Sequence, residues 1–174
     1  MPNIHLIEGP IGAGKSTFST SLAIQQSGVH IALDEWFAVL FSEDRSDTDF
    51  LPWYIERKSR CLELIWKHTR QIMASGTDAI LELGLIQQQS RQEFYGRMQS
   101  AGFDFSVYVL DASRDIRRER VQRRNLEKGP TFSMVVPDNV FEMASDLWEA
   151  PDEIESMERA IQFISTVPSA DCDG

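Results

Sequence analysis

The residue types best suited to a specific chemistry lie in the stretch GPIGAGKST, residues 9–17. Gly9, Gly14, Lys15 and Ser16 satisfy the pattern Gly-x-x-x-x-Gly-Lys-Ser, which binds phosphate when a strand precedes it and a helix follows. Glycines lack a Cβ, so the backbone can curl and point successive N–H groups at phosphate oxygens. The following helix adds unpaired N–H groups and the positive end of its dipole. The stretch therefore predicts a loop that binds a nucleoside triphosphate.

Two side chains of this loop have expected roles of their own. Lys15 should bridge the β- and γ-phosphates of ATP, and the Ser16 hydroxyl should bind Mg²⁺. A chance turn with a surface lysine is the alternative, but motif, strand and helix all agree with phosphate binding. The residues expected to bind ATP here are Gly9, Pro10, Ile11, Gly12, Ala13, Gly14, Lys15, Ser16 and Thr17.

Two carboxylates follow apolar runs and could act near the phosphates. Asp34, in LDEW, could accept the proton of an attacking hydroxyl, with Glu35 as a competitor for that role. Its alternative role is to cap a helix. Glu82, in AILELG, follows three apolar residues, and burying an unpaired carboxylate is costly. Glu82 could contact Mg²⁺ through water, or it could pair with an arginine.

A basic helix is expected over residues 113–125, with Ser113 as its N-cap. Arg117, Arg120 and Arg124 are spaced by three and four residues, so they share one face of this helix. A guanidinium group matches phosphate oxygens, and an arginine that closes over the phosphates stabilises developing charge. We therefore expect Arg120, Arg124 or both to contact the nucleotide.

The segment after this helix, NLEKGPTFSMVVPD, contains glycine and proline and has no clear periodicity. It is predicted to belong to a mobile lid at about residues 126–150. Residues 1–168 should form a single domain, because the sequence contains no repeat, low-complexity segment or Gly/Ser-rich linker. Residues 169–174 are expected to be a disordered tail.

Strands and helices are expected to alternate along the chain. Short runs of strand formers predict strands, and apolar residues at spacings of three and four predict helices. Such alternation gives right-handed crossovers and a mostly parallel sheet covered on both faces. The ligand of such a sheet lies at the carboxyl ends of the strands. The expected strands are residues 4–8, 29–34, 78–84, 105–111 and 160–166, and the expected helices are 15–27, 52–75, 90–102 and 113–125.

Charge and composition restrict the partners. The chain of 174 residues has a net charge of −10, which repels a nucleic-acid backbone. The acidic run SEDRSDTD at 42–49 is either a solvated loop or a wall that favours a cationic substrate. No stretch reaches the ~18 apolar residues of a membrane span, and the start lacks a secretory pattern, so we expect a cytoplasmic protein without membrane contact. Of the two cysteines, Cys61 should belong to the core.

The motifs together carry a resemblance. GPIGAGKST, the acid after the second strand, LELG, and VYVLDASRDIRRERVQRRN resemble the small P-loop kinases of the zeta-toxin and chloramphenicol phosphotransferase type, which are AAA_33-type ATP-binding proteins. The resemblance covers roughly residues 3–130. It implies an α/β P-loop NTPase fold of three αβα layers, with a five-stranded parallel sheet in the order 2-3-1-4-5 and a helical lid.

The resemblance also implies an activity, the transfer of the γ-phosphate of ATP to a hydroxyl group. Lys15 and Ser16 would hold the phosphates and the metal, Asp34 would be the base, and Arg120 and Arg124 would act from the lid helix. Many relatives have aspartate where this chain has Glu82.

The acceptor is expected to be a small molecule, such as an antibiotic or a metabolite. Aromatic residues after the second strand and in the lid could line its pocket or belong to the core. A polynucleotide 5′-hydroxyl kinase is one alternative, although it should have a basic, aromatic groove. A nucleotide-dependent switch or ATPase is another, and it would need an interaction surface. The protein should be a monomer or a homodimer.

Overall fold

The computed structural model describes residues 1–44, 48–129, 132 and 134–167. Five strands form one sheet in the order β2-β3-β1-β4-β5, and every neighbouring pair is parallel. This confirms the expected fold class. The strands are β1 Ile4–Glu8, β2 Val29–Ala32, β3 Ala79–Glu82, β4 Phe105–Asp111 and β5 Gln162–Ser165. The helices are α1 Lys15–Gln26, α2 Leu33–Phe41, α3 Phe50–Ala74, α4 Gln88–Ser100, α5 Arg114–Glu127, α6 Asp138–Asp146 and α7 Glu153–Glu158.

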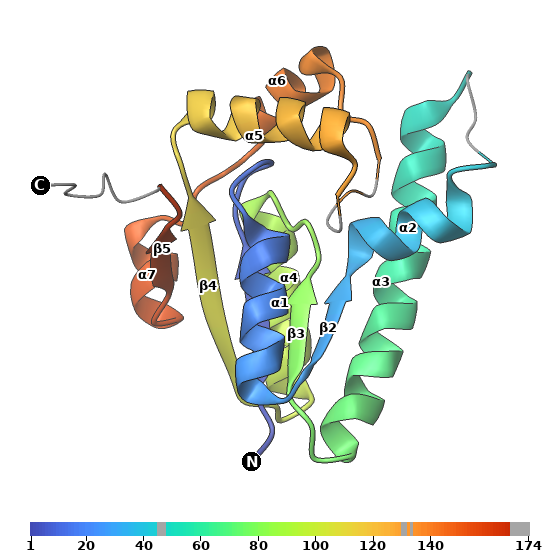
Figure 1. The fold of residues 1–174 in the computed structure, drawn as a ribbon. Helices are drawn as coiled ribbons and strands as arrows, with labels where there is room; N and C mark the ends of the chain where they lie inside the picture. Colours follow the sequence, from blue (N-terminus) through green and yellow to red (C-terminus); the bar gives the residue numbers. More distant parts are fainter. Residues whose placement is uncertain (45–47, 130–131, 133, 168–174) are drawn as a thin grey trace, which may run out of the picture.

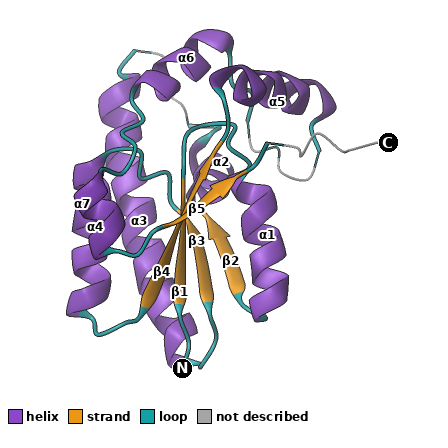
Figure 2. Cartoon of the chain, turned by 90° about the vertical axis from the view of Figure 1, so that its left-hand side faces the viewer, coloured by secondary structure: helices purple, strands orange, loops and turns teal. Residues whose placement is uncertain are grey.

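The helices surround the sheet on three sides. Helix α1 covers one face, while α3, α4 and α7 lie on the other (Figure 2). Helices α5 and α6 lie across the end of the sheet to which the strand arrows point (Figure 1). The carboxyl ends of the strands therefore open toward α5 and the loop between β1 and α1, where a parallel sheet places its ligand.

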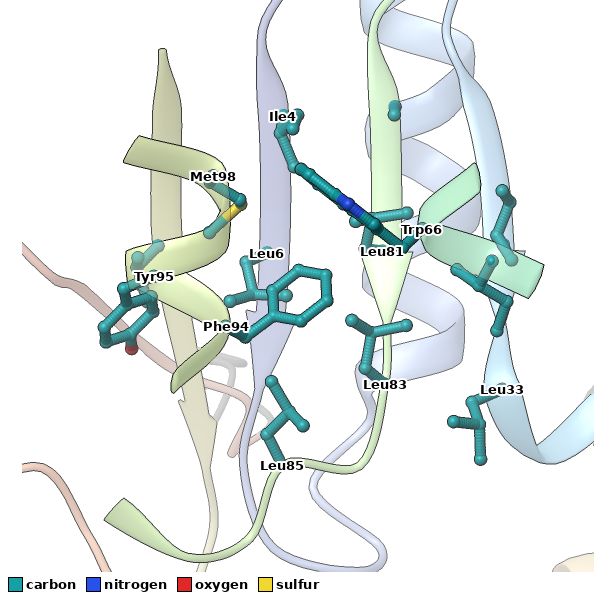
Figure 3. Packing of buried hydrophobic residues seen from close by; sticks show 14 of the residues in the cluster. Ile4, Leu6, Leu33, Trp66, Leu81, Leu83, Leu85, Phe94, Tyr95 and Met98 are labelled. Carbon is teal, nitrogen blue, oxygen red and sulfur yellow. The ribbon is translucent and has the colours of Figure 1, made fainter. Parts of the chain in front are cut away.

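The central strand β1 is buried along its whole length, and it carries His5 and Glu8 as well as three apolar residues. Ile4 and Leu6 belong to the larger core cluster on the α3 and α4 face, whereas Ile7 joins Leu22 in the cluster under α1. Figure 3 shows the larger cluster around Leu6 and Leu81. Cys61 is 1% exposed within that cluster, as expected.

Two helices differ from the expectation. The strand expected over residues 29–34 ends at Ala32, and α2 begins at once. Leu33 and Phe37 are both buried and four residues apart, so the apolar spacing favours a helix here. Helix α6 lies within the segment at about residues 126–150 that was expected to be a helical lid, whereas α7 was not expected.

Several expectations concern residues outside the described ranges. They are the tail at 169–174, part of the acidic run at 42–49, and part of the lid at about 126–150. Within the described ranges, no helix is both long and apolar enough to cross a bilayer.

Candidate active site

The loop between β1 and α1 lies tightly against two other elements. Gly9 has φ +142° and Gly12 has φ +77°, which are conformations that side chains disfavour. A Cβ on Gly9 would lie 2.3 Å from the carbonyl oxygen of Leu110, and one on Gly12 would lie 2.6 Å from that of Arg117. Glycine is therefore required at both positions, by the close approach of β4 and of α5.

Lys15 closes the loop from the first turn of α1. Its Nζ donates hydrogen bonds to the carbonyl oxygens of Gly9 at 2.9 Å and of Pro10 at 3.0 Å. Burial lowers the pKa of the ammonium, while the nearby carboxylates of Glu82 and Asp34 oppose that shift. The ammonium group is thus held at the loop and lies close to two carboxylates.

Ser16 and Glu82 form a pair of oxygen donors beside the loop. The Ser16 hydroxyl donates to Glu82 Oε1 at 3.0 Å, and His30 Nε2 lies 3.4 Å from Glu82 Oε2. Burial raises the pKa of Glu82, but His30, Lys15 and Ser16 outweigh it and hold the pKa below its usual value. Glu82 Oε2 is buried and has no hydrogen bond among the described residues. Among the described residues, no arginine forms an ion pair with Glu82, and His30 and Ser16 are its partners instead.

This pair suits a hard divalent cation. Mg²⁺ prefers oxygen ligands and is bound through one or two protein groups together with phosphates and water. A hydroxyl beside a carboxylate that has a spare oxygen meets that need. Among the described residues, no group of three or more His, Cys, Asp and Glu could hold a metal, so the pair would need the phosphates to complete a site.

Asp34 lies in the first turn of α2, and Ala32 is the N-cap, so the capping role considered for Asp34 is wrong. Its side chain keeps solvent access, yet desolvation by the surrounding protein raises the pKa of the carboxyl, against the opposing charge of Lys15. Lys58 and Arg124 also face this carboxylate. Asp34 therefore lies among three cations from three different helices.

A cavity of about 660 Å³ extends from the loop to α5. Arg120 and Arg124 both line it. Arg120 donates from Nη1 to Thr166 Oγ1 at 2.9 Å, whereas Arg124 Nε is buried and has no hydrogen bond among the described residues. The residues that line the cavity are Gly12, Ala13, Gly14, Lys15, Ser16, Thr17, Phe18, Ser21, Glu82, Arg120, Val121, Arg123, Arg124, Glu127, Gly129 and Thr166.

The structure thus brings most of the expected site residues together. Gly9, Pro10 and Ile11 belong to the loop but do not line the cavity. Asp34 does not line the cavity either, although its charge acts on Lys15. The expected phosphate contacts and the role of Asp34 as a base stay predictions.

The sequence analysis missed two residues that hold the site together. Thr166 follows β5 and donates from Oγ1 to the carbonyl oxygen of Ala13 at 2.7 Å. Arg117 donates from Nη1 to the carbonyl oxygen of Ile11 and to Ser145 Oγ, both at 3.1 Å. The position of Thr166 after a strand could have indicated it, but nothing in the sequence separates Arg117 from the other arginines of α5.

Comparisons with known proteins agree with this geometry. The model of the AAA_33 family, described as an AAA domain, matches residues 4–151. The search of curated proteins gives no match.

Three solved structures share the fold. A candidate kinase from Chloroflexus aurantiacus has a TM-score of 0.71 at 17% identity, covering 95% of this chain and 89% of its own. Kti12 from Chaetomium thermophilum, in complex with ADP-AlF3, has a TM-score of 0.70 at 15% identity, covering 94% and 89%. A gluconokinase from Sinorhizobium meliloti 1021 has a TM-score of 0.55 at 18% identity, covering 94% and 82%. At these identities the similarity shows the fold alone.

Proposed function

Because the chain belongs to the AAA_33 family of AAA domains, we propose that it is a P-loop kinase that transfers the γ-phosphate of ATP to a hydroxyl group of a small molecule. The observation that carries this proposal is the position of Asp34. Its carboxylate lies beside the lysine of the phosphate loop and also faces Lys58 and Arg124. A loop that only binds a nucleotide does not need a carboxylate at this place, whereas phosphoryl transfer to a hydroxyl does.

The proposed reaction follows from the residues around the loop. The acceptor oxygen forms a bond to the γ-phosphorus, the bond from that phosphorus to the β–γ bridging oxygen breaks, and ADP leaves with the electron pair. Asp34 orients the acceptor hydroxyl and takes its proton. Lys15 and Arg124 stabilise negative charge on the phosphate oxygens. Ser16 and Glu82 would hold Mg²⁺, which neutralises charge on the β- and γ-phosphates when it is bound.

Arg120 has a different part in this proposal. Its guanidinium group joins the cavity wall to Thr166, and Thr166 in turn holds Ala13 of the loop. It would therefore bind the nucleotide while keeping the loop and the end of β5 together.

The acceptor is proposed to be small rather than polymeric. The net charge of −10 opposes a nucleic-acid backbone. The aromatic residues on α2 and α3 pack mostly on one another, with Phe37 5.6 Å from Trp53 and 5.1 Å from Tyr54 between ring centroids. Most of them belong to the core or lie against it, whereas Phe50 is 40% exposed and stacks on Trp53 and Tyr54. The described part of these two helices therefore offers one exposed ring rather than a row of stacking surfaces for bases.

The test is transfer of labelled γ-phosphate from ATP to a panel of hydroxyl-bearing metabolites, antibiotics and 5′-hydroxyl oligonucleotides. With the acceptor that this panel identifies, Asp34→Asn should reduce transfer by ~10²-fold or more, the usual scale for a lost general base, while ATP affinity hardly changes. Asp104→Asn is the matched control, because Asp104 is exposed just before β4, at the opposite end of that strand.

Two results would contradict the assignment. Equal transfer rates in wild type and Asp34→Asn would show that Asp34 is not the general base. A complete loss of transfer in Glu35→Gln would then identify Glu35 as the base. ATP hydrolysis without transfer to any member of the panel would favour the switch or ATPase alternative.

A further inference from the structure

A buried cluster of ionisable side chains lies directly behind the phosphate loop, and the proposed mechanism does not use it. Glu8 is the last residue of β1, Arg91 and Tyr95 come from α4, and Glu155 comes from α7. Their exposures are 3%, 0%, 0% and 1%, so none of them reaches solvent to a useful extent. A buried charge must be paired or neutralised, so the protonation of this cluster needs an account.

The single guanidinium group of the cluster is committed to Glu155. Arg91 Nε donates to Glu155 Oε1 at 2.7 Å, and Nη2 donates to Glu155 Oε2 at 2.8 Å. Nη1 donates to the carbonyl oxygen of Glu149 at 2.7 Å. Glu8 Oε2 is 3.6 Å from Arg91 Nε, which lies within ion-pair range but is no hydrogen bond. The positive charge of Arg91 is therefore balanced before Glu8 is considered.

Glu8 has the environment of a neutral carboxyl group. Its Oε2 lies 3.1 Å from the Tyr95 hydroxyl, which also lies 3.2 Å from Glu155 Oε1, and Glu8 Oε1 is buried without a hydrogen bond among the described residues. The hydroxyl has one proton, so when Tyr95 donates it to the charged Glu155, a proton on Glu8 Oε2 can be donated to the Tyr95 oxygen. Burial raises the pKa of Glu8 from 4.5 to about 8, against Arg91 and Tyr95 and with a further increase from Glu155. With a proton on Glu8 the cluster has one positive and one negative charge.

Two other charged groups lie close to this cluster, Asp152 at the start of α7, whose pKa Arg91 helps to lower, and Arg159 at the end of α7. Its guanidinium lies 5.1 Å from the centre of the Tyr95 ring. The ionisable groups that act on Glu8 itself are Arg91, Tyr95 and Glu155, which come from α4 and α7. Deprotonation would therefore add a second negative charge that no further cation of the described structure compensates.

Glu8 is covalently joined to the residue that anchors the loop. Gly9 follows it, and the Gly9 carbonyl oxygen accepts the hydrogen bond from Lys15 Nζ. Gly9 also packs against the backbone of β4 so closely that no side chain fits. A shift of the backbone at Glu8 would therefore also move the start of the loop, because Gly9 packs so closely on β4 that the strand end has little room.

We propose that Glu8 is a positioning residue that supports the phosphate loop only while it carries a proton. When that proton is lost to solvent, Glu155 repels the carboxylate of Glu8, and the carboxylate is more stable in contact with water. The end of β1 then shifts with the side chain. The part of the inference that concerns the nucleotide rests on the function proposed above. The neutral form is the supporting one, so Glu8→Gln should keep the support at every pH.

The direct test follows the loop in the absence of any nucleotide. Hydrogen exchange of the amides of Gly9 and of residues 11–14 is compared between wild type and Glu8→Gln at the same pH, once near pH 6.5 and once near pH 9. We expect equal exchange at the lower pH and, at the higher pH, exchange about fivefold or more faster in the wild type, the lower end of usual coupling effects. Equal exchange at both values would overturn the proposal.

A second variant controls for the loss of a carboxyl group. Glu93→Gln removes an exposed carboxylate from the same helix that holds Arg91 and Tyr95, and it should behave like the wild type at both pH values. If Glu8→Gln does not fold, infrared spectroscopy of the wild type shows instead whether Glu8 is protonated. A protonated carboxyl band that persists at neutral pH and disappears on titration near pH 8 supports the proposal, and its absence at neutral pH overturns it.

The consequence for the site is tested with Mg–ADP. Its affinity should fall by about fivefold or more between neutral pH and pH 9 in the wild type relative to Glu8→Gln. Loss of the Lys15 charge at high pH can also lower the affinity for Mg–ADP. That effect is common to both proteins, so the difference between them reports on Glu8 alone. Failure of Mg–ADP to bind at any pH would contradict the proposed function, while the exchange measurement would still decide the role of Glu8.

Discussion

Lys15 illustrates how one side chain serves structure and chemistry at the same site. Without a nucleotide its ammonium group satisfies the carbonyl oxygens of Gly9 and Pro10, and it lies near Asp34 and Glu82. Phosphate oxygens are stronger acceptors than carbonyl oxygens for a charged donor. The loop is thus held in a shape close to the one that it needs, and a ligand has only to replace two hydrogen bonds.

Lys15→Met tests this double role. Loss of the ammonium should weaken ATP binding by ~10-fold or more, since a hydrogen bond to a charged group contributes about 1.5–3 kcal/mol. Calorimetry measures the affinity, and chemical denaturation should show only a small stability loss, because the cost of burying the ammonium group offsets its two loop contacts. Lys67→Met, on the exposed side of α3, is the control. Unchanged ATP affinity in Lys15→Met would contradict the assignment of the loop.

Arg124 has a buried hydrogen-bond donor without a partner among the described residues, which indicates a ligand. Its Nε is buried and unsatisfied among the described residues, and the group faces Asp34 and Glu82. Arg124→Ala should lower phosphoryl transfer by at least ~10-fold with little change in thermal stability, because the guanidinium meets charge that develops in the transition state. Arg70→Ala, at an exposed position of α3, should leave both unchanged. A lower melting temperature with normal turnover would instead make Arg124 a structural residue.

At the scale of elements, α5 is the structure that organises the site. Its Arg117 reaches the loop and α6, its Arg120 reaches the end of β5, and its Asn125 pairs with the backbone of Val136. The helix therefore connects the loop, the last strand and the segment before α6. These contacts hold the described part of the predicted lid against α5.

The close approach of α5 to the loop makes Gly12 a test of this arrangement. Gly12→Ala adds a Cβ 2.6 Å from the Arg117 carbonyl oxygen, so either the loop or α5 must move. Gly76→Ala is the matched control, because Gly76 has φ +81°, close to the +77° of Gly12, with no atom within 4 Å of an added Cβ. Gly76→Ala should cost ~1–2 kcal/mol of unfolding free energy from backbone strain alone.

Gly12→Ala should cost more than this in urea unfolding and should also lose nucleotide binding. An equal loss of stability in the two variants, with binding retained in both, would show that the contact between the loop and α5 is not restrictive.

At the scale of the whole molecule, the buried cluster behind the loop connects β1, α4 and α7 and so ties the carboxyl-terminal part of the chain to the centre of the sheet. Trp148 covers Arg91, with the guanidinium 5.3 Å from the ring centre. The backbone amide of Glu149 also donates to the Ile86 carbonyl oxygen. The stability of the molecule should therefore depend on the charge of this cluster.

The sign of that dependence follows from Glu8, whose pKa is raised from 4.5 to about 8. Between these values the unfolded chain has lost the proton and the folded chain keeps it, so unfolding releases a proton and stability falls as the pH rises. In urea unfolding, wild type should lose up to ~1.4 kcal/mol per pH unit relative to Glu8→Gln in this window. Glu93→Gln should keep the wild-type slope. Parallel pH profiles for wild type and Glu8→Gln would contradict the assignment of the proton.

The sequence alone was sufficient for the phosphate loop and the parallel sheet, and its resemblance to the small P-loop kinases supplied the order of the strands. A phosphate loop depends on contiguous residues, and alternating apolar runs restrict the connections to a few arrangements. The expected gathering of Lys15, Ser16, Glu82 and Arg124 followed, because strand ends and the helix after β4 meet at one edge.

The remaining features were decided by the tertiary structure, because their partners are distant in the chain. Thr166 and Ala13 are 153 residues apart, and Arg91 and Glu155 are 64 apart. Nothing in the local pattern around Glu8 indicates that α4 and α7 close over it, so its burial and its proton could not be inferred. A side chain acquires such a role from the low dielectric and the neighbours that folding provides, and those depend on the packing of the whole chain.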